Sequence, residues 1–170
     1  MANKTKNIIF FTVTNVIFMV NGMWACAQNR TNFLEANSYN TSFSLVTAAD
    51  LETQKVKSNA FQVEVMSRSN DRFNIYARVS SSSSSTGVNM PASMLSVKLN
   101  SITPLLNVNY NTITLSNTDQ LLQQVTTPFL FWLLWFSTIN FSYDLQLGPV
   151  GYDYPPGNYN FTVLFTMTQP

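Results

Sequence analysis

The chain of 170 residues contains no histidine and only one cysteine, Cys26. Catalytic relays of the Ser-His-Asp and Cys-His types need an imidazole beside the nucleophile, and nothing in this sequence can supply it. The usual structural and catalytic zinc sites, which are built from His and Cys ligands, are excluded for the same reason. We therefore predict a protein that is not an enzyme, with no catalytic residues, no metal site and no cofactor.

Charge and glycine are also scarce. Charged residues make up only 10% of the chain, and the last basic residue is Lys98. Nucleic-acid binding needs clustered Lys and Arg to displace counterions, so we expect no nucleic-acid partner. The five glycines form neither of the common phosphate-binding loop patterns. Two carboxylates acting as acid and base remain a less favoured route to hydrolysis, although no pair among the eight Asp and Glu residues stands out.

The first 27 residues have the pattern of a secretory leader. Lys4 and Lys6 precede an apolar block over residues 8–20, and Ala25-Cys26-Ala27 provides a small-x-small cleavage site. We predict a signal peptide over residues 1–27 and a mature domain over residues 28–170, exported to the periplasm, the cell surface or the extracellular space. Two alternatives stay open: lipidation of Cys26, which Trp24 fits poorly, and an uncleaved membrane anchor.

Apolar and polar residues alternate with period two in many segments after residue 40, and helical periodicity is scarce. Residues 61–65 and 73–79 alternate on either side of Asn70-Asp71 and are predicted to form a hairpin. Two long alternating segments, residues 139–147 and 159–167, predict strands with one buried face. With about seven or eight strands at short spacings, we expect one all-β domain, an antiparallel, immunoglobulin-like β-sandwich.

Two segments are predicted to lie outside the strands. Residues 118–125 carry Leu121, Leu122 and Val125 at helical spacing after a capping residue, which predicts one short crossover helix. The serine run over residues 80–85 is predicted to be a surface loop because it is hydrophilic and of low complexity.

The run Pro128–Phe136 is far more aromatic than the rest of the chain. Its nine residues are too few for a helix that spans a bilayer. A strand buried on both faces is one interpretation, and an exposed apolar edge used for contact with another subunit or a membrane is the other. The candidate interaction residues are Phe129, Phe131, Trp132, Trp135 and Phe136, together with Tyr152 and Tyr154 from a later turn.

The closing block, Tyr154–Thr168, has a Pro/Gly turn, a Gly-x-Tyr step at Gly157–Tyr159 and a last strand of alternating apolar residues. This block resembles the ending of bacterial fimbrial and pilin-like β-sandwich domains. The resemblance covers about the last 30 residues, and it implies a structural or adhesive role at a bacterial cell surface. The chain departs from many such subunits in having no disulfide and in its aromatic run.

An exported sandwich has sheet edges that can accept a strand from another chain. The candidate strand-exchange segment is residues 29–46, in which Tyr39, Thr41, Phe43 and Leu45 share one parity; the alternative is an ordinary first strand of the domain's own sheet. We therefore expect a protein partner or further copies of this chain. A second hypothesis is a secreted carbohydrate- or lipid-binding module, in which Trp132, Trp135, Tyr152 and Tyr154 stack on or insert into the ligand.

Overall fold

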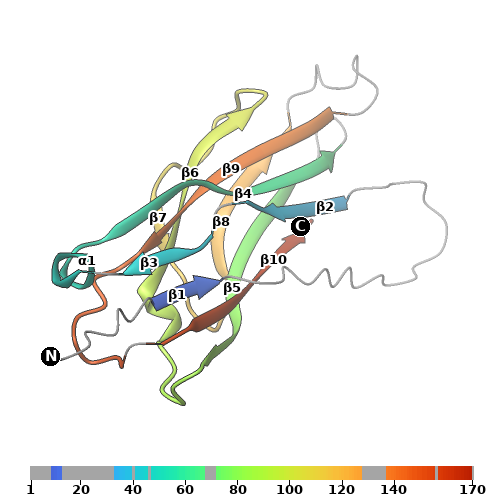
Figure 1. Cartoon of the computed structure of the whole chain (residues 1–170). Helices are drawn as coiled ribbons and strands as arrows, with labels where there is room; N and C mark the ends of the chain where they lie inside the picture. The colour runs from blue at the N-terminus through green and yellow to red at the C-terminus, as the bar shows by residue number, and fades with distance from the viewer. Residues whose placement is uncertain are drawn as a thin grey trace, which may run out of the picture.

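The computed structural model describes residues 9–12, 33–39, 41–45, 47–67, 72–127, 137–155 and 157–169, and all statements below concern these residues. Their strands form two five-stranded sheets packed face to face (Figure 1). Sheet A has the order β3 (Phe43–Leu45), β1 (Ile9–Thr12), β10 (Tyr159–Thr168), β5 (Arg72–Ser84), β8 (Gln120–Thr126). Sheet B has the order β2 (Phe33–Ser38), β4 (Lys55–Ser67), β9 (Ser137–Leu147), β6 (Leu95–Thr103), β7 (Thr112–Thr114). The predicted all-β sandwich is confirmed.

Successive strands often lie in opposite sheets. β4 is in sheet B, β5 in sheet A and β6 in sheet B, and the chain changes sheet again between β7, β8, β9 and β10. The predicted hairpin of residues 61–65 and 73–79 is therefore wrong, because β4 and β5 belong to different sheets. Both strands show the same alternation of apolar and polar residues. This alternation indicates that one face of each strand is buried, but it does not indicate which strand is its hydrogen-bonded neighbour.

The core lies between the sheets and is filled by the alternating apolar residues. In β9 the inward residues Ile139, Phe141, Tyr143, Leu145 and Leu147 are at most 1% exposed. Aromatic rings meet across the two layers: the ring of Phe73 in sheet A is edge-on to Phe141 in sheet B, with centroids 6.5 Å apart, and Phe165 and Phe61 make a similar contact at 5.5 Å. Such edge-to-face pairs add to the stabilisation from burial.

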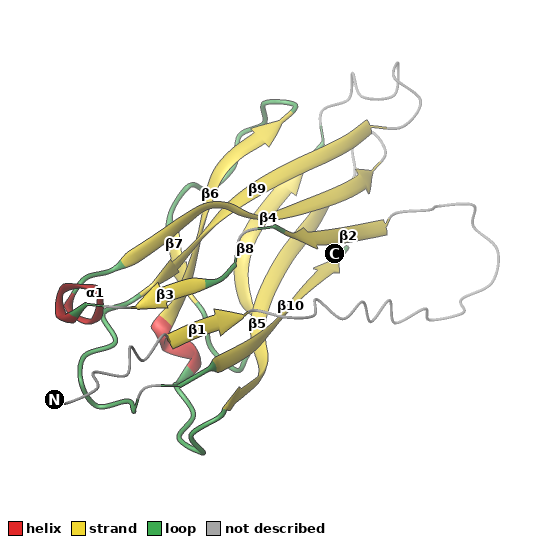
Figure 2. Ribbon diagram, in the orientation of Figure 1, coloured by secondary structure: helices red, strands yellow, loops and turns green. Residues whose placement is uncertain are grey.

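The helix predicted at residues 118–125 is wrong, because this segment forms strand β8. The pairing of β8 with β5 passes from Ile75↔Gln123 to Tyr76↔Leu121 and leaves Leu122 as an extra residue. This β-bulge buries Leu122 and Gln123 in succession and breaks the alternation, so the apolar spacing looks helical. The described helices lie elsewhere, as Figure 2 shows: α1 (Ala48–Glu52) follows β3, and a short 3-10 turn, η1 (Ala92–Met94), precedes β6.

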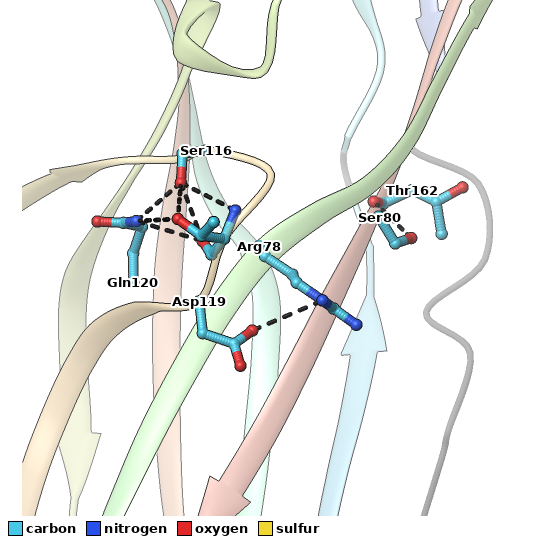
Figure 3. Close-up of polar contacts among 7 residues, drawn as sticks. Arg78, Ser80, Ser116, Asp119, Gln120 and Thr162 are labelled. Atoms are coloured by element: carbon cyan, nitrogen blue, oxygen red, sulfur yellow. Dashed lines mark hydrogen bonds and ion pairs between the residues drawn. The ribbon is translucent and has the colours of Figure 1, made fainter.

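The serine run is also part of the sheet, contrary to the expected loop. β5 continues through Ser84, and its last residues pair with the start of β10 from Tyr159↔Ser84 to Thr162↔Ser81. Ser80 donates a hydrogen bond to the Thr162 carbonyl at 3.2 Å, as Figure 3 shows, and the Ser81 hydroxyl donates to the Thr162 hydroxyl at 3.1 Å. Main-chain pairing with β10 thus holds hydrophilic residues in an extended strand.

Candidate strand-pairing edge of sheet A

Strand β1 is inserted between β3 and β10 and comes from the apolar block of the predicted leader. It runs antiparallel to β3, with the pairs Ile9↔Leu45, Phe10↔Ser44 and Phe11↔Phe43. It runs parallel to β10, with the pairs Phe11↔Tyr159 and Thr12↔Asn160. This is the one parallel pairing among the described strands (Figure 1). We call the place between β3 and β10 that β1 occupies the slot.

The register of the slot places two of its positions opposite core residues. Leu45 and Phe43 on β3 are each 2% exposed, and Tyr159 on β10 is fully buried. The backbone register therefore places positions 9 and 11 of the slot opposite buried residues of its walls. The position between them lies opposite Ser44, which is exposed.

The described part of the candidate strand-exchange segment, residues 33–39 and 41–45, lies in the domain's own sheets and the loops beside them, and its other residues lie outside the described part of the chain. Tyr39 is 64% exposed, and its backbone N–H donates to the Ala60 carbonyl at 2.9 Å. Thr41, Phe43 and Leu45 are buried, and Phe43 and Leu45 belong to β3. In this structure Phe43–Leu45 is thus a strand of the domain's own sheet A. The segment therefore forms one wall of the slot within its own sandwich.

The aromatic candidates fall into three groups. The run that contains Phe129, Phe131, Trp132, Trp135 and Phe136 lies outside the described residues, so the prediction for it stays a prediction. Tyr152 is 67% exposed, and its hydroxyl donates to Glu52 at 2.9 Å; this contact is the main cause that raises the pKa of Tyr152. Tyr154 is partly buried against the core, with its ring edge-on to Tyr159 at a centroid distance of 6.3 Å. Only Tyr152 of the described pair is displayed to solvent.

A shallow groove of about 410 Å³, not predicted from the sequence, lies beside the edge strand β8. It is lined by Asn107, Val108, Asn109, Leu121, Leu122 and Gln124. The buried Gln123 fixes the loop at this edge, because its amide accepts from Asn109 N–H at 2.9 Å and donates to the Asn109 carbonyl at 2.6 Å. Two apolar side chains of the same loop are exposed, Leu105 at 84% and Tyr110 at 42%.

Several carboxylates have structural contacts. Thr47 is the N-cap of α1 and forms a capping box with Asp50, whose carboxylate also forms an ion pair with Lys55 at 2.6 Å. Asp144, which the strand parity predicts to be solvated, is partly buried and accepts a hydrogen bond from Asn59 N–H at 2.9 Å. This contact holds the bulge of β4, where Asn59 has a φ of 51°.

The ion pair between Arg78 and Asp119, with 3.6 Å between Nε and Oδ1, lies next to the hydrogen bonds that connect Ser116 and Gln120 (Figure 3). It joins β5 to the residue that precedes β8. Within the part of the chain that the structure describes, no group of three or more Asp, Glu, His or Cys residues could hold a metal ion.

One buried polar group has no evident structural use. The Tyr143 hydroxyl lies in the core and has no hydrogen-bond partner at normal geometry among the described residues. Burial raises the pKa of Tyr143, and the side chain of Gln123 lowers it to a smaller extent. The phenol is therefore held in its neutral form, which is a poor nucleophile and a poor base.

Comparison of this chain with protein-family models, with curated proteins and with solved structures found no match. The resemblance to fimbrial and pilin-like domains therefore stays a prediction from the closing block. No helix among the described residues is long and apolar enough to cross a membrane.

Proposed function

We propose that this protein is an exported structural or adhesive subunit of a bacterial cell surface, and that it acts by pairing its strands with other proteins. One observation carries the proposal: residues of the predicted leader, Ile9–Thr12, form a strand inside sheet A. Cleavage after Ala27 would remove that strand. The exported domain would then have an open place in a sheet that the precursor closes with its own leader.

Cleavage would expose two strand edges that can pair with another strand. Without β1, sheet A is divided into β3 on one side and β10, β5 and β8 on the other. The edges that faced β1 carry main-chain N–H and C=O groups, which can bind an added strand with regular hydrogen bonds. The buried residues Phe43 and Tyr159 line the same place, so an added strand would also restore apolar contact.

The test begins with the full chain expressed with its own leader in a bacterial host. N-terminal sequencing of the exported product should find cleavage after Ala27. Size-exclusion chromatography with light scattering, over a wide range of concentrations, should then show assembly of the mature domain or a stable complex with a co-purified protein. Cytosolic material that retains Met1, or a product that stays monomeric and without partners at the cell surface under chemical cross-linking, would contradict the proposal.

A second candidate is a carbohydrate- or lipid-binding module, and the groove beside β8 favours it. Asn107, Asn109 and Gln124 bring amide groups to this groove, and the exposed Tyr110 belongs to the same loop. Amides and an exposed aromatic ring are suited to the hydroxyl groups and apolar faces of sugars. Glycan-array and liposome binding should then be lost in Tyr110→Ala or in the double variant Trp132→Ala, Trp135→Ala, and retained in the control Tyr39→Ala.

A further inference from the structure

We propose that Gln123 is a two-position latch that controls access to the free edge of strand β8. In the position that the structure shows, Gln123 holds the loop of residues 104–111 beside β8. In the second position Gln123 binds Tyr143, the loop moves away, and β8 pairs antiparallel with β8 of a second copy of this chain. The residues involved all follow the predicted leader, so this inference goes beyond the proposed function and does not depend on cleavage.

Strand β8 differs from the other end strands of the two described sheets. These end strands are β3 and β8 in sheet A, and β2 and β7 in sheet B. β3 and β7 have three residues each, and β2 carries Glu35 near its middle. β8 has seven residues and no charged side chain. Short strands and charged side chains are common devices against edge-to-edge association, and β8 has neither of them.

The loop of residues 104–111 lies beside this edge. The loop and β8 together line the groove described above, the loop with Asn107 and Asn109 and the strand with Leu121 and Gln124. Among the described residues, no backbone hydrogen bond joins the loop to β8, so the outward main-chain groups of β8 are not used by the loop. A strand that pairs with β8 would lie about 4.8 Å from it and would therefore displace the loop.

Gln123 provides the polar contact that holds the loop. Its buried side chain accepts a hydrogen bond from the Asn109 N–H at 2.9 Å and donates one to the Asn109 carbonyl at 2.6 Å. The Asn109 side chain is used within the loop, where its oxygen accepts from the Asn111 N–H at 2.9 Å. Leu106 and Val108 add apolar contact with the core. When Gln123 turns away, that apolar contact is what still holds the loop to the core.

Tyr143 offers Gln123 a second hydrogen-bond partner. The Tyr143 hydroxyl is buried and has no partner at normal geometry among the described residues. Burial raises the pKa of Tyr143, and the Gln123 side chain lowers it to a smaller extent, which places the two groups near each other. The position in the structure leaves this hydroxyl unpaired, whereas the second position pairs it and leaves the Asn109 main chain to water. Each position has a cost that the other lacks, so the two can be close in free energy.

The uncovered edge fits a second copy of itself. The pairing of β8 with β5 is regular from Gln123 to Thr126, beyond the bulge at Leu122, and this part can extend sheet A. Two such strands related by a two-fold axis pair antiparallel. Because β8 has no charged residue, this pairing brings no like charges together. It would also shield Leu121, which is 45% exposed in β8.

Hydrogen exchange of the Asn109 N–H, resolved by NMR, tests the latch directly, because Gln123 binds this N–H. In Gln123→Leu the exchange should be about tenfold faster, and in Tyr143→Phe it should be about threefold slower, since Gln123 then lacks its second partner. The reference is the Leu115 N–H, which is bound to the Leu95 carbonyl at 2.8 Å and should change in neither variant.

Analytical ultracentrifugation of the exported protein tests the pairing with a second copy. Gln123→Leu should strengthen self-association relative to the parent protein, by about tenfold if the loop is fully released, and Tyr143→Phe should weaken it. Adding Gln124→Lys to Gln123→Leu should abolish this gain, because like charges then meet at the β8 edge. The matched control is Ser142→Lys, which adds the same charge on β9 in sheet B and should preserve the gain.

Three results would each overturn this inference. The first is Asn109 exchange that is unchanged in Gln123→Leu, and the second is exchange that is unchanged or faster in Tyr143→Phe. The third is self-association of Gln123→Leu that does not exceed that of the parent protein or that persists with Gln124→Lys. If Gln123→Leu does not fold, the Asn109 exchange in Tyr143→Phe decides. All of these results leave the proposed function standing, because it depends on cleavage after Ala27 and on assembly of the parent protein.

Discussion

The centre of sheet B and the part of sheet A around β1 differ in how far their strands are paired. β9 pairs with β4 from Lys55↔Leu147 to Ser67↔Ser137, and it pairs with β6 on its other side. β1 pairs with β3 only from Ile9 to Phe11 and with β10 only at Phe11 and Thr12. The comparison teaches that the length of the ladders distinguishes the two strands: β9 is held by long ladders on both sides, whereas β1 has short ladders and belongs to a segment predicted to be removed.

The largest expected effect is in the centre of sheet B. Phe141→Ala should lower the free energy of unfolding of the exported protein by about 3–5 kcal/mol, because Phe141 is fully buried and its ring contacts Phe73 and Tyr143. The neighbouring Ser142 points to the other face, and Ser142→Ala should change the free energy of unfolding by less than about 0.5 kcal/mol. Urea denaturation measures both. Equal effects would show that the two faces of β9 are not distinguished in the folded protein.

A smaller effect is expected beside the slot, although Phe43 is buried almost as completely as Phe141. In the exported domain without a bound strand, Phe43→Ala should cost about 1–2 kcal/mol, less than the usual range for a buried phenylalanine, because β1 no longer covers this position. A synthetic peptide of residues 7–14, which contain β1, should raise the urea midpoint of the unsubstituted protein and should raise it less for Phe43→Ala. A cost equal to that of Phe141→Ala would mean that the edge is as well packed as the centre without β1.

The smallest effect is expected from a single atom in the core. Tyr143→Phe removes a buried hydroxyl that has no hydrogen-bond partner at normal geometry among the described residues, so the free energy of unfolding should stay unchanged or rise by about 1 kcal/mol at pH 7. The pKa of Tyr143 is raised by burial. Above pH 10, near the ordinary tyrosine pKa, the unfolded chain therefore loses this proton while the folded chain keeps it, and stability falls as pH rises.

Tyr143→Phe should reduce that alkaline loss, measured as the urea midpoint from pH 8 to pH 11. Ser142→Ala on the other face of β9 provides the control, since it removes no ionisable group and should leave the pH profile unchanged. A Tyr143→Phe profile identical to that of the parent protein would show that the buried phenol does not titrate differently in the two states.

Much of the fold could be predicted because its long strands have strict alternation. The segments at 139–147 and 159–167 appear as β9 and β10 with one buried face, as predicted. The helix predicted at residues 118–125 failed because the bulge at Leu122 gives a strand the apolar spacing of a helix. The loop predicted for the serine run is wrong for a different reason. The extended form of this run depends on pairing with β10, and the composition of the run does not indicate that partner.

The candidate site was predicted only in outline. The sequence predicted residues 29–46 to be a strand-exchange segment or an ordinary first strand. Phe43–Leu45 within this segment is a strand, but its place as a wall of the slot depends on β1. The composition of the leader block predicts a targeting segment and not a strand. Ile9 and Phe11 are nevertheless two residues apart, as alternate residues of a strand are, and they pair with Leu45 and Phe43. The groove beside β8 has no sequence signal of its own, because its amide side chains resemble the many others in the chain.

The sequence by itself determined that this chain is a sandwich of strands, and the absence of histidine excludes catalytic relays that need an imidazole. Both follow from local facts: residue type, and a period of two that assigns each strand a core face. The tertiary structure alone decided which strands are neighbours and in which direction they run, and it placed Ile9–Thr12 between β3 and β10. The physical reason is that the main-chain groups that pair strands are the same at nearly every residue, so a strand's partner is selected by packing across the whole domain.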